Sequence, residues 1–167
     1  MERALLPVSM LSLLSIGAIF GFFYAWVCST MWGLDAAAPE VAIAAMQAMN
    51  ASVRNAVFFP AFFLTPVFLA LAGIVSLRCG RGKSAMLFAA AAVLYTLGAL
   101  VVTATVNVPM NEALAMVAIP ADTDEAAAIW TAYSSEWQVW NMRRTIVSGV
   151  ALILTGFAVF FLNERSR

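Results

Sequence analysis

The stretch LLPVSMLSLLSIGAIFGFFYAWVCSTMW, residues 5–32, contains no charged side chain and decides the fold class. It exceeds the roughly 20 apolar residues that an α-helix needs to cross the hydrocarbon core of a bilayer. It also exceeds the apolar core of a signal peptide, which is about 7–15 residues long, and no small-x-small cleavage site closes it. We therefore expect an uncleaved helix that spans a membrane.

Three further apolar runs follow the first. The sequence is 63% hydrophobic and only 11% charged, whereas a typical soluble domain carries about 25% charged residues. The apolar residues are concentrated in the runs 5–32, 56–77, 84–106 and 146–162. These runs predict an all-α polytopic membrane protein, a single domain over residues 1–167 built as an antiparallel bundle of four transmembrane helices. The outer connections 33–55 and 107–145 are expected to form a helical cap on one face.

Charged residues divide into a basic set and an acidic set along the chain. The basic set lies at the chain ends and between the second and third runs: Arg3, Arg78, Arg81, Lys83, Arg165 and Arg167. The other two connections hold Asp35, Glu40, Glu112, Asp122, Asp124, Glu125 and Glu136, against Arg54, Arg143 and Arg144. Because basic connections stay in the cytoplasm, both termini are expected there, in a bacterial inner membrane, with the acidic connections outside.

Histidine is absent, and the only two cysteines lie far apart. Histidine is the commonest haem and transition-metal ligand, so neither a b-type cytochrome nor a histidine-based metal enzyme is expected. Cys28 falls at the outer end of the first run and Cys79 at the inner end of the second, whereas a disulfide needs Cα atoms within roughly 7 Å. We predict no disulfide, no metal site, no cofactor and no nucleic-acid partner.

Glycine and proline suggest how the helices pack. Gly17 and Gly21 form a Gly-x-x-x-Gly stripe in the first run, which permits close helix approach and also a helix–helix oligomer. Pro39 is expected to start a helix that continues through residue 55 into the second run, where two prolines would kink it. Pro109 is expected to break or bend the third helix just beyond its apolar run.

The second outer connection contains its own helix start. Asp122 and Glu125 resemble a capping box that opens a helix at about Thr123. On such a helix one stripe leads into the fourth span: Trp130, Trp137, Asn141 and Arg144. The cap is therefore expected to be continuous with the bundle.

Amides and guanidinium groups gather at the outer ends of the spans. The asparagines are Asn50, Asn55, Asn107, Asn111 and Asn141. Arg54 begins the second span and Arg144 the fourth, so the bundle can bring them together under the cap. Buried groups of this kind need partners. They predict either a polar ligand pocket or a structural network, in which the arginines would reach the interface or pair with acids.

The candidate site combines three kinds of side chain. Candidate ligand-binding residues are Met46, Asn50, Arg54, Asn107, Asn111, Trp137, Trp140 and Asn141, the two indoles as a stacking wall. Trp32 is instead expected in the aromatic belt at the membrane surface. Candidate catalytic residues are Arg144, as an anion grip, and Glu112 or Glu136, as general base. The alternative for either acid is a solvated or salt-bridged role.

Three segments carry a resemblance to a known family. NVPMNEAL at 107–114, WQVWNMRRT at 137–145 and Met46-x-x-x-Asn50 resemble the anthrone oxygenase-like small integral membrane proteins, in order and at similar spacing. The resemblance covers nearly the whole chain and implies a four-span bundle. For fungal members it implies oxidation of anthrones to anthraquinones without a metal or flavin. Members often carry His after the Asn of the Trp-Asn motif, where this chain has Met142. If that His is the base, this chain has either lost it or moved its role to Glu112 or Glu136.

The leading hypothesis is a cofactor-independent oxygenase that acts on a planar phenolic substrate dissolved in the membrane. Deprotonation would give a carbanion that can transfer an electron to oxygen, with the arginines and asparagines holding the developing oxyanion. The alternative is a non-catalytic module that binds a lipid, quinone, pigment or partner membrane protein. A transporter is less favoured, because no charged residue lies deep within a span. In each case the expected partners include the lipid bilayer and an apolar small molecule.

Overall fold

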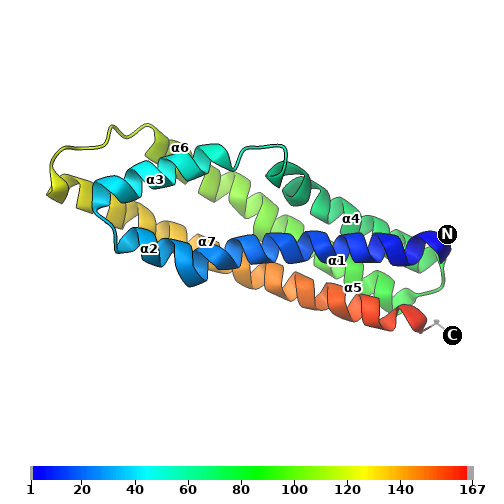
Figure 1. Cartoon of the computed structure of the whole chain (residues 1–167). Helices are drawn as coiled ribbons and strands as arrows, with labels where there is room; N and C mark the ends of the chain where they lie inside the picture. Colours follow the sequence, from blue (N-terminus) through cyan, green and yellow to red (C-terminus); the bar gives the residue numbers. More distant parts are fainter. Residues whose placement is uncertain (1, 165–167) are drawn as a thin grey trace.

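Four long helical segments lie side by side, and both chain ends are at the same end of the bundle (Figure 1). The structure is a computed structural model that describes residues 2–164. Its α-helices are α1 (Glu2–Ala25), α2 (Met31–Asp35), α3 (Pro39–Ser52), α4 (Phe58–Arg78), α5 (Gly82–Tyr95), α6 (Val108–Ala115) and α7 (Thr123–Phe160). π-Helical turns at Trp26–Thr30, Thr96–Val101 and Thr103–Asn107 join α1 to α2 and α5 to α6, and a 3₁₀ turn at Phe161–Asn163 follows α7.

The predicted all-α, four-span fold is confirmed. Helical segments long and apolar enough to cross a membrane are Glu2–Asp35, Phe58–Arg78, Gly82–Ala115 and Thr123–Asn163. The first, third and fourth extend beyond their apolar runs, and together with α3 they build the cap. The outer faces of the bundle carry exposed apolar side chains such as Leu14, Leu71 and Phe160. Such a surface suits contact with lipid chains.

The apolar interior has two parts. The bundle interior includes Ile16, Phe23, Leu69, Phe88 and Tyr95, each at most 1% exposed. The cap interior includes Met31, Ile43, Met46, Leu114 and Trp130. Close approach of the third helical segment to α7 depends on Gly98, where a Cβ atom would lie only 2.5 Å from a methyl carbon of Val147.

The expectation that the helix beginning at Pro39 continues into the second span is wrong. Helix α3 ends at Ser52 and α4 begins at Phe58. The side chain of Asn55 explains the break, because its Oδ1 accepts hydrogen bonds from the backbone N–H groups of Val57 (2.8 Å) and Phe58 (2.9 Å). Asn55 therefore caps the first turn of α4, where backbone donors lack helical partners. Pro60 falls in that turn and Pro66 lies inside α4.

The expected break at Pro109 is absent as well. The third span remains helical from Gly82 to Ala115, with Pro109 in the first turn of α6. The helix is irregular before Pro109, in the π-helical turns Thr96–Val101 and Thr103–Asn107. Local π adjustments allow a transmembrane helix to continue past proline, because they relieve the clash of the ring with the preceding turn.

The cap is fastened to α7 by hydrogen bonds. As predicted, Asp122 caps the start of α7, and its carboxylate accepts the N–H of Glu125 at 2.9 Å. The hydroxyl of Thr123 donates to Glu40 at the start of α3, and this bond lowers the pKa of that carboxyl. At the end of α2, Asp35 accepts from three side chains of α7: Trp130 Nε1 (3.0 Å), Ser134 Oγ (2.7 Å) and Gln138 Nε2 (2.9 Å).

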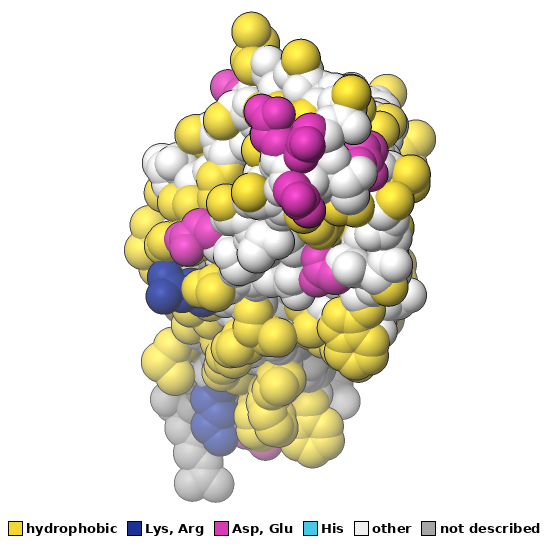
Figure 2. Space-filling view, turned by 90° about the vertical axis from the view of Figure 1, so that its left-hand side faces the viewer, with side chains coloured by type: hydrophobic (Ala, Val, Ile, Leu, Met, Phe, Trp, Pro, Cys, Tyr) yellow, Lys and Arg dark blue, Asp and Glu magenta, His cyan; other side chains and the backbone are white. Residues whose placement is uncertain are grey.

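Acidic side chains gather on the surface of the cap, as the end-on view in Figure 2 shows. Arg81 and Lys83 lie at the opposite end, beside the chain termini. Arg165 and Arg167, which contributed to the predicted orientation, fall outside the described residues. Cys28 and Cys79 are both free, as expected. A Cβ atom at Gly17 would meet Leu152 of α7 at 3.9 Å and one at Gly21 would meet nothing within 4 Å, so an oligomer through this stripe stays a prediction.

Candidate functional site

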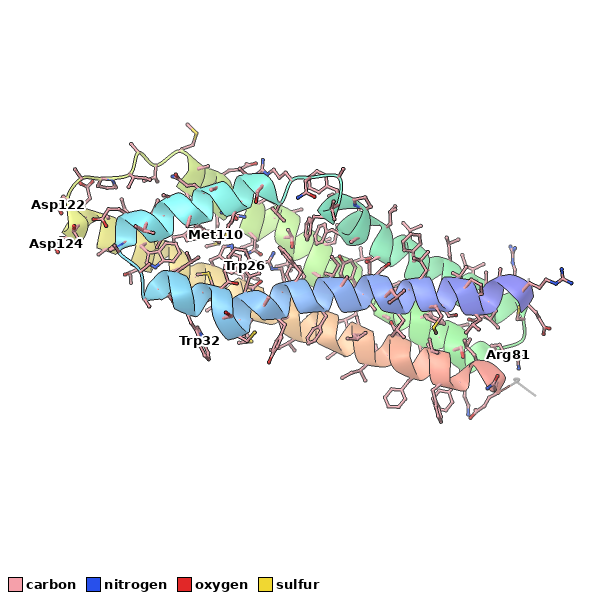
Figure 3. The ribbon with its side chains drawn as sticks, in the orientation of Figure 1. Trp26, Trp32, Arg81, Met110, Asp122 and Asp124 are labelled. Carbon is pink, nitrogen blue, oxygen red and sulfur yellow. The ribbon has the colours of Figure 1, made fainter. Side chains whose placement is uncertain are left out.

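A cavity of about 300 Å³ lies between the helices at the cap end of the bundle. Its polar lining consists of Asn50, Arg54, Thr103, Asn111, Glu112, Asn141 and Arg144. Its aromatic lining consists of Phe22, Phe23, Trp26, Phe58, Phe59, Phe62, Phe63 and Trp137. Trp26 points between the helices, whereas Trp32, 67% exposed, points away from them (Figure 3). Apolar cavities with a few convergent polar groups are typical of small-molecule sites.

Arg144 is the only charged side chain of the lining that is buried, with 5% of its surface exposed. Its Nη1 donates to the hydroxyl of Thr103 and its Nη2 to Oδ1 of Asn141, both at 3.0 Å. Its guanidinium carbon also lies 4.6 Å from the ring centroid of Phe23 and 5.4 Å from that of Trp137. Its Nε–H has no hydrogen-bond partner. Since a guanidinium carries five N–H donors, most of its donor capacity remains unused.

No carboxylate pairs with this guanidinium within residues 2–164. The ion pairs in that part of the chain include Arg54–Glu112 and Lys83–Glu164, and neither involves Arg144. The partners of Arg144 are neutral groups and aromatic faces, which compensate a buried charge only in part. Arg144 is therefore a buried cation without an anionic partner among residues 2–164.

Asn141 fixes the position of Arg144. Its Nδ2 donates to the backbone carbonyl of Phe23 at 3.1 Å, and its Oδ1 accepts from Arg144. The carbonyl of Phe23 lies shortly before the π-helical turn at Trp26–Thr30. A π-helical turn shifts the hydrogen-bond ladder of a helix and is frequent at functional sites. The Phe23 carbonyl is thus the acceptor that orients the Asn141 amide.

A second polar group closes the cavity on the cap side. Asn111 Oδ1 accepts from the hydroxyl of Tyr133 at 2.8 Å and from the indole N–H of Trp137 at 3.1 Å. Asn50 Nδ2 donates to the same hydroxyl at 3.3 Å, which links α3 to this network. Gln47 strengthens the link, because its Nε2 donates to the carbonyls of Leu114 and residue 117.

The Arg54–Glu112 ion pair lies at the mouth of the cavity. The Nη2–Oε1 distance is 3.3 Å, and 49% and 59% of the two side chains is exposed. The pair joins the end of α3 to α6 across the opening. Unlike Arg144, both members can exchange their contacts with water, so an ion pair of this kind contributes little to stability.

Comparison with protein families supports the resemblance found in the sequence. The family model described as anthrone oxygenase matches residues 49–154, which is more than half of the chain. The chain belongs to the anthrone oxygenase family. Comparison with curated proteins and with solved structures gives no match.

The anthrone oxygenase match contains most of the cavity but not its α1 wall. It begins just before Asn50 and includes both arginines of the cavity lining. Phe23 of α1 and Trp26 of the following π-helical turn lie outside it, and they complete the site by packing against Arg144 and Trp137 respectively. No group of three or more Cys, Asp or Glu side chains within residues 2–164 is arranged to hold a metal ion.

The structure brings most of the predicted site residues into this one cavity. These are Asn50, Arg54, Asn111, Glu112, Trp137, Asn141 and Arg144. Asn107 is adjacent but does not line it. Asn107 lies one turn from both Thr103 and Asn111, is 1% exposed, and has no hydrogen-bond partner for either amide atom.

Three other candidates lie elsewhere. Met46 is fully buried in the apolar interior of the cap. Trp140 and Glu136 bond to each other on the outer surface of α7, with Nε1 to Oε1 at 2.7 Å. Arg143 stacks on the same indole, 4.3 Å from the ring centroid. Neither Glu136 nor Trp140 therefore faces the cavity.

Sequence reasoning missed the phenylalanine walls, Tyr133 and Thr103. One signal was present in the second span, where Phe58-Phe59 and Phe62-Phe63 repeat at helical spacing. Tyr133 precedes Trp137 by one helical turn, so its position on the stripe of Trp130, Trp137, Asn141 and Arg144 was a second signal. Thr103 gave no signal, because hydroxyls are common in transmembrane helices and usually bond to their own backbone.

Proposed function

We propose that this anthrone oxygenase family member oxidises a planar aromatic ketone with an acidic C–H bond, such as an anthrone, in the cavity beside Arg144. The observation that carries the proposal is the buried guanidinium without a carboxylate partner. A substrate of this class becomes an anion during the reaction, and its negative charge develops largely on the ring oxygen. Arg144 then stabilises the anion more than the neutral ketone, which is the requirement for catalysis.

The cavity suits a flat, apolar molecule with one polar edge. Aromatic rings of α1 and α4 face the polar residues of α6 and α7 across it. Trp26 and Trp137, 5.1 Å apart between centroids, provide indole surfaces for stacking. The free Nδ2 of Asn111, whose oxygen already accepts two hydrogen bonds, can donate to a second oxygen of the substrate.

Glu112 is the proposed base. It is a carboxylate of the cavity lining, and Arg54 restrains it at 3.3 Å while leaving it 59% exposed. An acid in this position can take a proton from a ligand in the cavity and release it to water. Glu136 was the other candidate, and its bond to Trp140 outside the cavity removes it from this role in the proposal.

The proposed reaction balances with dioxygen as the oxidant. Glu112 removes one proton from the ring CH₂ carbon, and the carbanion transfers an electron to dioxygen. The radical and superoxide combine, and protonation gives a hydroperoxide at that carbon. Loss of the second C–H proton with cleavage of the O–O bond forms the new carbonyl and releases water. We propose that no cofactor takes part, because a resonance-stabilised carbanion can transfer an electron to dioxygen directly.

The test compares two neighbouring arginines in protein reconstituted into vesicles. Arg144→Gln should lower the rate of quinone formation from anthrone by about 10²–10³-fold, the usual effect of removing an oxyanion donor. Arg143→Gln, on the outer surface beside Trp140, should leave it unchanged. Oxygen uptake and quinone absorbance measure the rate. Equal rates in the wild type and Arg144→Gln would contradict the proposal, and binding of anthrone without turnover would support a non-catalytic binding module instead.

A further inference from the structure

A second hollow, of about 490 Å³, adjoins the cavity between α1 and α4. We call it the α1–α4 groove. The side chains that line both the groove and the cavity are Phe22, Trp26, Met49, Val53 and Phe58. These shared side chains lie between the two spaces, so the groove adjoins the proposed site.

The groove offers no polar group to a ligand. The residues that line it without lining the cavity are Ala18, Ile19, Ser52, Asn55, Val57 and Ala61. The hydroxyl of Ser52 donates to the carbonyl of Met49 at 3.0 Å. The Asn55 amide donates to the carbonyl of Ser52 at 2.7 Å and caps α4 through its oxygen. Both polar side chains thus make hydrogen bonds within the chain, and the rest of the lining is apolar.

The groove opens sideways, between two membrane-spanning helices. Ala18 lies within the first span and is exposed, and Ala61 lies within the second. Val57 at its cap-side edge is 85% exposed. Leu14, one turn from Ala18 on α1, is 71% exposed and continues the apolar outer face. A molecule dissolved among lipid chains meets this opening directly.

Polar contacts cross the cap side of the cavity, whose mouth lies at the half-exposed Arg54–Glu112 pair. The Asn50–Tyr133–Asn111 hydrogen bonds and the Arg54–Glu112 ion pair cross it. The barrier toward the groove consists of aromatic contacts without hydrogen bonds. The rings of Phe22 and Phe58 lie 4.8 Å apart between centroids. Phe58 is the first residue of α4, directly after the irregular connection, so its ring can rotate aside without breaking a polar contact.

We propose that the α1–α4 groove is a vestibule through which a planar apolar ligand passes sideways from the hydrocarbon layer to the cavity beside Arg144. The inference rests on the proposed function for the identity of the ligand. It concerns the route of entry and not the reaction, so it can be tested with a ligand that does not react. Narrowing a vestibule slows association and dissociation by the same factor, so the dissociation constant stays unchanged.

The experiment narrows the groove from each wall. Ala18→Phe and Ala61→Phe add a ring at residues that line only the groove. Ala70→Phe is the matched control, since Ala70 also lies on α4 but lines a different hollow, beside α5. Anthraquinone is the probe, in phosphatidylcholine vesicles, and quenching of tryptophan fluorescence after rapid mixing gives both rates. Trp137 lines the cavity and not the groove, so its quenching reports occupation of the cavity.

We expect both groove variants to slow association and dissociation by about tenfold, with the dissociation constant and the control unchanged. Rates equal to those of Ala70→Phe would overturn the vestibule, as would a change confined to the dissociation constant. Using two variants keeps the test valid if one of them fails to fold. If the binding kinetics are as expected but anthrone is not turned over, the proposed function alone is wrong. If the wild-type protein does not bind anthraquinone, both the vestibule and the proposed function are overturned.

Discussion

At the end of the bundle that holds both termini, Lys83 and Glu164 form an ion pair of 2.7 Å in which 66% and 47% of the side chains is exposed. At the cap end, Arg144 is 5% exposed and has only neutral partners. The exposed Lys83–Glu164 pair requires little desolvation and contributes little to the free energy of unfolding. Burying the Arg144 guanidinium costs desolvation free energy, and its contacts with neutral groups offset only part of that cost. The difference supports the proposal that the cap end binds an anion, because the terminal end holds its charges at the surface whereas the cap end buries one without an ionic partner among the described residues.

The largest effect is expected at the mouth of the cavity. Glu112→Gln should reduce quinone formation from anthrone by about 10²-fold or more, because the amide cannot accept the substrate proton. Glu136→Gln is the matched control, since Glu136 bonds to Trp140 outside the cavity. Steady-state rates at saturating anthrone measure the effect. If Glu136→Gln is the slower of the two, the base has been assigned to the wrong acid.

A smaller effect on activity, together with a loss of stability, is expected at Asn141. Asn141→Leu leaves the Phe23 carbonyl and Arg144 each without one hydrogen bond. The free energy of unfolding should fall by about 1–3 kcal/mol, and turnover should fall because the guanidinium is no longer held in place. Thermal unfolding in detergent measures the first quantity. Met142→Leu, at an exposed neighbour, should change neither, and an unchanged stability of Asn141→Leu would refute the positioning role.

The smallest effect is expected at the terminal end. Lys83→Met should lower the free energy of unfolding by less than about 1 kcal/mol and leave anthrone turnover unchanged. A double-mutant cycle with Glu164→Gln isolates the energy of the ion pair. A coupling well above this value would show that the terminal pair is as important as the cap contacts and would remove the contrast between the two ends.

The sequence predicted the parts of the fold that depend on long or local patterns. Uncharged runs of membrane length gave the four spans, and Asp122 with Glu125 gave the start of α7. The break before Phe58 was missed because Asn55 was grouped with the asparagines of a pocket or network, and its role as the cap of α4 was not considered. The π-helical turns have no recognised sequence signature, so continuation of the helix through Pro109 was not foreseen.

The sequence predicted the polar residues of the candidate site but not its aromatic walls. Polar residues at the ends of spans are few, so Arg144, Asn111 and Asn141 stood out, and the structure places them together. An entirely apolar run does not show which face points inward, so the phenylalanines of α1 could not be assigned to the cavity. Trp140 was included because it lies near Trp137, yet it occupies a different face of α7 and bonds to Glu136.

In the proposed function, Arg144 holds an anion and does not stabilise the fold. The most direct measurement compares the wild type with Arg144→Met in the same vesicles, recording both the free energy of unfolding and the affinity for a planar phenolate. We predict that the affinity falls at least about tenfold while stability is unchanged or higher, since replacing a buried charge by an apolar side chain of similar size is often neutral or stabilising. Unchanged affinity with a loss of several kcal/mol of stability would show that Arg144 is a structural residue and would contradict the account.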